Sequence, residues 1–140
     1  MQAMKRFWIG CCLLVSVVGA TMQQAGSGMA AELVRVDRIW DQAHHNAFTD
    51  LARFKGQWFC VFREGTRHVS DDGSLRVLRS EDGSKWESVA LIESDDSDLR
   101  DAKLSVTPDG KLMLSGAGAL HDPSEGSHQS YNWFSDDGVT

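Results

Sequence analysis

The sequence predicts an all-β protein built from repeated four-stranded units. Helical periodicity is nearly absent after residue 31, and short runs of β-branched and aromatic residues alternate with Gly, Asp and Ser turns. The order of runs and turns then starts again in the second half of the chain. With 140 residues, the chain is long enough for one domain.

The first unit contains four expected strands. A tight turn at Lys55-Gly56 separates the first two, a polar loop precedes the third, and a second turn precedes the fourth. In order, the expected strands and connections are 47–54, the turn 55–56, 57–62, the loop 63–73, 74–78, the turn 80–83 and 86–92.

The second unit repeats this order and contains three expected strands. An acidic loop leads into it, and its parts are 101–107, the turn 108–110, 111–115, a Gly-, His- and Ser-rich loop 116–129, 130–134 and the turn 135–138. Gly56 and Gly110 are 54 residues apart, and Gly83 and Gly138 are 55 apart. Four strands at this period favour a β-propeller of four to eight blades, with a β-sandwich as the alternative.

The N-terminal residues 1–31 predict a signal peptide. Lys5 and Arg6 precede an apolar run that is too short to span a membrane, and small residues follow near residues 18–20 and 29–31. An uncleaved anchor and a lipoprotein are the alternatives. We therefore expect residues 32–140 to be exported, to the periplasm or outside the cell, with no membrane contact after cleavage.

Charge and cysteine use limit the partners. Without Lys5 and Arg6 the chain has 12 basic and 20 acidic residues, a net charge of −8, which argues against nucleic acid as a partner. Cys11 and Cys12 leave with the signal, so Cys60 has no disulfide partner, and its apolar surroundings predict a buried, inert thiol.

Two turns share one motif. The first reads Ser80-x-Asp82-Gly83-x-x-Trp86, and the second reads Ser135-x-Asp137-Gly138-x-Thr140. We expect the Ser and Asp side chains to bind backbone N–H groups and the glycine to take a positive φ.

These turns resemble Asp-boxes, the repeats of the sialidase (neuraminidase) family, although each is one residue shorter than the usual box. Residues 48–86 resemble the first blade of that family and residues 99–114 the second. The resemblance implies a six-bladed propeller, of which residues 32–140 are about two N-terminal blades truncated at the C-terminus. It also implies an exported glycoside hydrolase that removes terminal sialic acid or a related acidic sugar from glycans, without a cofactor.

The chain also departs from the family. The arginine that usually binds the substrate carboxylate in the first blade is missing, because residues 48–51 read Phe-Thr-Asp-Leu. The remaining catalytic residues of the family lie in later blades, so we expect this fragment itself to be inactive and unable to fold stably alone. A non-catalytic glycan- or protein-binding propeller and a purely structural repeat protein are the alternatives.

Turn parity predicts where a site would lie. Successive turns of an up-and-down blade alternate between two ends, so segments 44–50, 63–73, 93–101 and 116–129 should share one end. That end carries the candidate site residues. The catalytic candidates are Asp50, Asp101 and Glu64, and the substrate-binding candidates are Arg63, Arg67, His68, Arg100 and His128.

Structural roles compete for the same residues. Asp50 and Asp101 could instead bind turn backbone, and Arg63 could form an ion pair between blades with Asp101 or Glu64. The acidic run 93–98 is interpreted as a solvated loop, and the histidines lack the spacing of a metal site.

Overall fold

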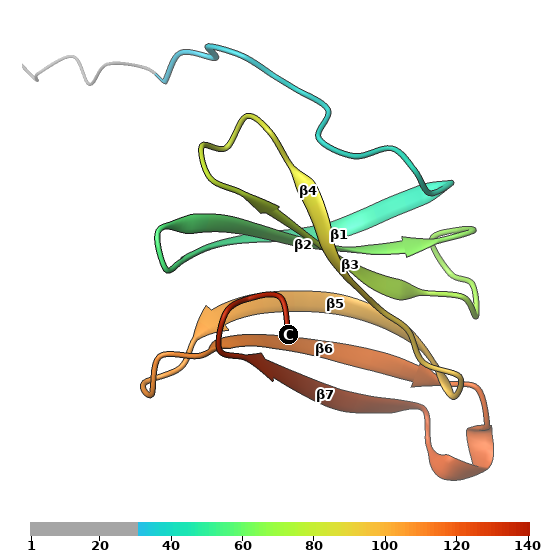
Figure 1. Ribbon diagram of the computed structural model, residues 1–140. Coiled ribbons are helices and arrows are strands. Elements are labelled where there is room, and N and C mark those ends of the chain that lie inside the picture. Colours follow the sequence, from blue (N-terminus) through green and yellow to red (C-terminus); the bar gives the residue numbers. More distant parts are fainter. Residues whose placement is uncertain (1–30) are drawn as a thin grey trace, which may run out of the picture. The chain divides into compact units, whose positions relative to one another are not determined.

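The structure, a computed structural model, describes residues 31–140, and residues 36–140 form one unit with two antiparallel sheets (Figure 1). The first sheet has the strand order β1-β2-β3-β4 and the second has the order β5-β6-β7. The elements are β1 (His45–Phe54), β2 (Gln57–Gly65), β3 (Ser74–Ser80), β4 (Glu87–Ile92), β5 (Ser97–Val106), β6 (Leu112–Leu120), the 3-10 helix η1 (Pro123–Glu125) and β7 (His128–Ser135). Within this described part, no helix is long and apolar enough to cross a membrane.

The all-β class and the order of seven strands are confirmed, but every strand except β4 is longer than expected, and β5 and β6 differ most from their expected bounds. β5 begins at Ser97 rather than at residue 101, and β6 continues to Leu120 rather than ending at 115. The extension of β6 depends on Gly116 and Gly118, because a Cβ on Gly118 would lie 2.5 Å from Oγ of Ser97 and 2.6 Å from the ring of Tyr131. Small residues, interpreted as a loop signal, here permit close approach of the neighbouring strands.

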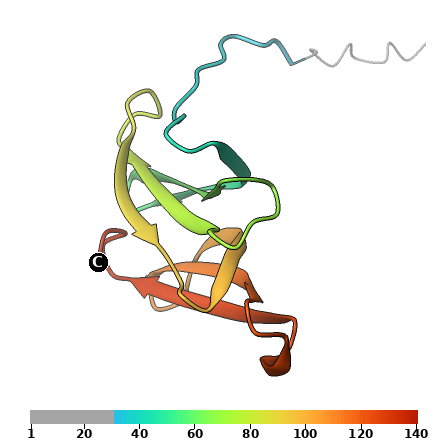
Figure 2. The ribbon, with the colours of Figure 1, turned by 90° about the vertical axis from the view of Figure 1, so that its right-hand side faces the viewer.

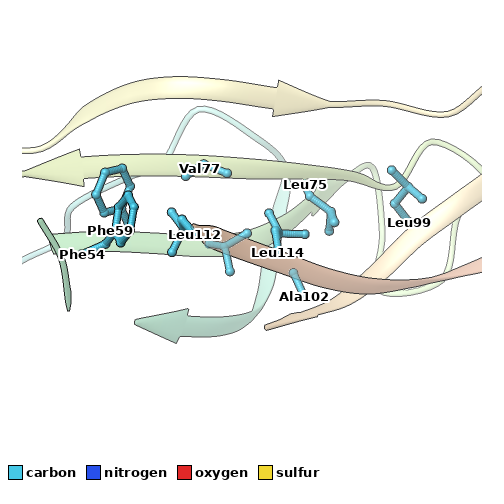
Figure 3. Packing of buried hydrophobic residues seen from close by; sticks show 9 residues of the cluster. Phe54, Phe59, Leu75, Val77, Leu99, Ala102, Leu112 and Leu114 are labelled. Carbon is cyan, nitrogen blue, oxygen red and sulfur yellow. The ribbon is translucent and has the colours of Figure 1, made fainter. Parts of the chain in front are cut away.

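The main core lies between the two sheets. Alternate residues of β2 point into it, starting with Phe59 and Val61, both with no exposed surface. The cluster is completed by Phe54, Leu75, Val77, Leu99, Ala102, Leu112 and Leu114, and Figure 3 shows the side chains of this cluster, all of them labelled except Val61. Burial of each Leu or Phe stabilises the fold by about 1.5–3 kcal/mol, so this interface holds the sheets together.

A second cluster covers the opposite face of the first sheet. The intervening residues of β2 and β3, Cys60, Phe62 and Leu78, are buried there beneath the side chains of Trp40 and Trp86. The first sheet is therefore covered on both faces, which explains why β2 is buried over most of its length.

Each sheet begins with a strand that contains a bulge at the same place. The pairing of β1 with β2 shifts between Ala47 and Asp50, and the pairing of β5 with β6 shifts between Arg100 and Lys103. Phe48 has a φ of 58° and Asp101 has a φ of 55° inside these bulges. The first strand of each sheet therefore holds one non-glycine residue, 48 or 101, at a positive φ inside a bulge.

Candidate functional site

The segments that turn parity assigned to one end do come together there. Leu99 donates its backbone N–H to the carbonyl of Gly73 at 2.9 Å. The ring nitrogens of His121 lie 3.1 Å and 3.0 Å from the carbonyl oxygens of Asp95 and Asp71, and the rings of His45 and His68 are 5.4 Å apart. Figure 2 shows the β2–β3 connection beside the strands of the second sheet at this end.

Arg63 lies inside this end and contacts Asp98 rather than solvent. Its side chain has no exposed surface, and both Nε and Nη2 donate to Oδ1 of Asp98, at 2.9 and 2.8 Å. The guanidinium also donates to the carbonyls of Arg67 and Ser70, at 2.9 and 3.2 Å. All of its nitrogens are thus used within the chain, and Arg63 joins the two sheets as a buried ion pair.

Asp98, the partner of Arg63, is only 3% exposed. The interpretation of the acidic run 93–98 as a solvated loop is therefore wrong at this residue. The expected partners, Asp101 and Glu64, are not the ones used. Gly73 explains how the pair fits, since a Cβ there would lie 1.7 Å from Oδ1 of Asp98 and 2.6 Å from Nε of Arg63.

Glu64 points to the opposite face of β2 and is held by Arg76. Nη2 of Arg76 donates to Oε2 at 2.9 Å, Nε donates to Oε1 at 3.2 Å, and Nε1 of Trp40 also donates to Oε1. Glu64 is 7% exposed, so this catalytic candidate lies in a structural ion pair on the outer face of the first sheet.

Asp50 connects the first strands of the two sheets. Its Oδ2 accepts the backbone N–H of Leu104 in β5 at 2.8 Å. Asp50 also raises the pKa of Cys60, although burial of the thiol is the larger cause, and together they raise it to about 11. The expected burial of Cys60 is confirmed.

Asp101 differs from the other two carboxylates. It is exposed on the bulge of β5, and none of the residues described by the structure forms a hydrogen bond or an ion pair with its side chain. Asp is among the few non-glycine residues that tolerate a positive φ. Of the three catalytic candidates, Asp101 is the exposed one, and neither of its carboxylate oxygens has a partner among the described residues.

The substrate-binding candidates divide in the same way. Arg100 is paired with Oδ2 of Asp98 through Nη2, and its Nε is buried with no hydrogen-bond partner in the described part of the chain. The exposed residues Arg67, His68 and His128 have side-chain nitrogens that form no hydrogen bond within residues 31–140. Arg67 takes part in the loop only through its backbone, whose N–H donates to Oγ of Ser70 at 3.3 Å and whose carbonyl accepts from Arg63.

The first motif turn has the geometry expected from its residues. Oγ of Ser80 accepts the N–H of Gly83 at 2.8 Å, Oδ1 of Asp82 accepts the N–H groups of Ser84 and Lys85 at 2.8 and 3.1 Å, and Gly83 has a φ of 78°. Nε1 of Trp86 donates to the carbonyl of Gly83 at 3.0 Å. Hydrogen bonds from Ser84, followed by those from Lys85, lower the pKa of Asp82.

The second motif turn repeats these bonds. Oγ of Ser135 accepts the N–H of Gly138 at 2.7 Å, and Oδ1 of Asp137 accepts the N–H groups of Val139 and Thr140, both at 2.8 Å. Gly138 has a φ of 82°, and the hydrogen bonds from Thr140 and Val139 lower the pKa of Asp137. Both turns are therefore structural elements, as expected, and they lie at the end away from the candidate site.

The sequence interpretation did not include Phe48, which lies at the site end beside His68 with a ring separation of 5.4 Å. Alignment of the two units would have marked it, because Phe48 and Asp101 are 53 residues apart, close to the spacing of the turns. Among residues 31–140 no group of three or more His, Cys, Asp and Glu side chains is placed to hold a metal ion. The predicted signal peptide lies, apart from Ala31, outside the described residues.

Comparison with known proteins adds no relative: no family model, no curated protein and no solved structure matches the chain.

Proposed function

We propose that the two sheets are the first blades of a sialidase-like β-propeller and that the protein is an exported glycoside hydrolase acting on a terminal acidic sugar. The observation that carries the proposal is the recurrence of two features in both units, the hydrogen-bonded box turn at one end and the bulge of the first strand at the other. A repeated unit with a fixed turn and a variable opposite end is the usual organisation of a propeller that binds its ligand with loops.

Asp101 is the residue we assign to the chemistry. A general acid or base must reach the glycosidic oxygen or a water molecule, and an exposed carboxylate without internal partners can do so. Arg67 and His68 lie at the same end, and their side-chain nitrogens form no hydrogen bond with any residue that the structure describes. A guanidinium is well suited to a sugar carboxylate.

A non-catalytic glycan- or protein-binding propeller is the second candidate. It is favoured by the use of Arg63 and Arg100 in binding Asp98, which leaves these two guanidinium groups paired within the chain. The absence of the family's first-blade arginine from residues 48–51 points the same way.

Hydrolysis by the natural gene product tests the proposal. We expect release of the fluorescent aglycone from 4-methylumbelliferyl N-acetylneuraminic acid or from a matched uronic acid glycoside. Asp101→Asn keeps the size of the side chain and tolerates the positive φ, and it should lower kcat by about 10²–10⁴-fold through loss of acid–base catalysis. Asp109→Asn, in the turn at the other end, should leave kcat unchanged.

If the wild-type protein cleaved neither of these two glycosides, the proposed hydrolase activity would be wrong. If the protein still bound the same sugars, the non-catalytic candidate would take its place.

A further inference from the structure

Phe48 occupies a backbone conformation that is unfavourable for its side chain. Its φ of 58° lies in the left-handed region, where Gly, Asn and Asp are tolerated and a bulky side chain is a true outlier. The other non-glycine residues with a positive φ have local explanations, because Lys55 belongs to a hairpin turn and Asp101 is an Asp.

The fold demands the conformation at this position but not the phenylalanine. The equivalent bulge of β5 has Asp at the same place, so a small polar residue satisfies the backbone there. Nor does the core need the ring, since Phe48 belongs to neither buried cluster and is 41% exposed. A residue that is poor for the backbone and unused by the core points to a function for its side chain.

The ring of Phe48 is the first of three in contact. Its centroid lies 5.4 Å from that of His68 at an interplanar angle of 51°, and His68 lies 5.4 Å from His45 at 71°. Within the described residues no hydrogen bond holds His68, and Nδ1 of His45 is buried without a partner. The two imidazoles therefore do not serve as internal bridges, in contrast to His121.

We propose that the ring of Phe48 is a platform on which the apolar face of a pyranose ring stacks, with the tilted ring of His68 at the edge of the sugar and Arg67 next to His68 in the same loop. The proposal rests on the proposed function, because it assigns the place where that site holds its sugar. One face of a pyranose carries C–H groups that pack on an aromatic ring, while an imidazole offers both an aromatic face and hydrogen bonds to hydroxyl groups. The free charge of Arg67 selects an acidic sugar over a neutral one.

Substitutions of Phe48 in the natural full chain separate binding from folding. Phe48→Gly relieves the left-handed strain, so its Tm should equal or exceed that of the wild type. The matched control is Leu51→Gly, because Leu51 is exposed on the same strand without a positive φ and should lose Tm.

Binding is measured with methyl α-N-acetylneuraminide and methyl β-galactoside by titration and by saturation-transfer NMR. We expect about a tenfold weaker Kd for the acidic sugar in Phe48→Gly, rescue in Phe48→Trp, and saturation transfer to the sugar C–H protons that is weaker in Phe48→Gly than in the wild type. The wild type should prefer the acidic sugar.

Three results would overturn the proposal. A Tm loss in Phe48→Gly as large as in Leu51→Gly would make Phe48 a structural residue, and an unchanged Kd would remove the platform while leaving the proposed function standing. If the wild type bound neither sugar, the platform and the proposed function would both fall.

Discussion

Replacement of Asp98 by asparagine removes the negative charge that compensates a fully buried arginine. The carboxylate is 3% exposed, accepts two hydrogen bonds from Arg63 and one from Arg100, and lies between the two sheets. Asparagine keeps one acceptor for Arg63 but faces Arg100 with an NH₂ group, so a cation stays buried without its counter-charge. Removal of one partner of such a pair typically costs about 3–5 kcal/mol.

We expect Asp98→Asn to lie near the lower limit, at about 3 kcal/mol, because two backbone carbonyls still accept from Arg63. Urea denaturation of wild type and variant, followed by fluorescence, measures the change in midpoint at constant m. Asp96→Asn is the matched control, since its exposed carboxylate should matter by less than about 0.5 kcal/mol. A loss below about 1 kcal/mol for Asp98→Asn would refute the assignment of this pair as the link between the sheets.

Three further predictions follow from the same contacts. Gly73→Ala should unfold the protein more readily than Gly56→Ala in urea, because the first places a methyl group on the ion pair while the second meets only the strain of a φ of 83°; equal losses would contradict the close packing. Hydrogen bonding lowers the pKa of Asp82 in the folded state, so the stabilisation by its carboxylate is present above about pH 4 and declines as the pH falls. Asp82→Ala should therefore weaken the dependence of the free energy of unfolding on pH in acid, while Glu81→Ala leaves that dependence unchanged. Because the pKa of Cys60 is raised to about 11, we expect iodoacetamide at pH 8 to alkylate this thiol slowly in the folded protein and rapidly in urea. Peptide mass spectrometry measures the labelling, and rapid labelling without urea would contradict a buried thiol.

The strands and turns of this chain could be predicted because their signals are local. Gly83 and Gly138 both have a positive φ. Each is held in its turn by the same bond, because the Oγ of Ser80 or Ser135 accepts the backbone N–H of the glycine three residues later. Such interactions need only neighbouring residues, so the spacing of the motif contains all of the information. The length of β6 could not be predicted, because the role of Gly118 depends on the distant residues Ser97 and Tyr131.

The meeting of the loops at one end was predicted, but not which of their charged residues are exposed there. Strand parity places the loops at one end whatever their side chains, and the contacts of His121 agree with that placement. Which charged residue faces solvent depends on how the two sheets pack together, and this is why Asp98 is buried with Arg63 although the run 93–98 was interpreted as a solvated loop. The positive φ of Phe48 likewise arises from a bulge in β1, which the residues around it in the sequence do not predict.

An experimental structure of the natural protein with bound N-acetylneuraminic acid tests the central claim most directly. We predict that the sugar lies at the end formed by the first strands of the two sheets, with its ring on Phe48 and the Asp101 carboxylate within hydrogen-bond distance of the sugar. Binding only at the box-turn end, or a structure in which Asp101 is buried, would contradict the account.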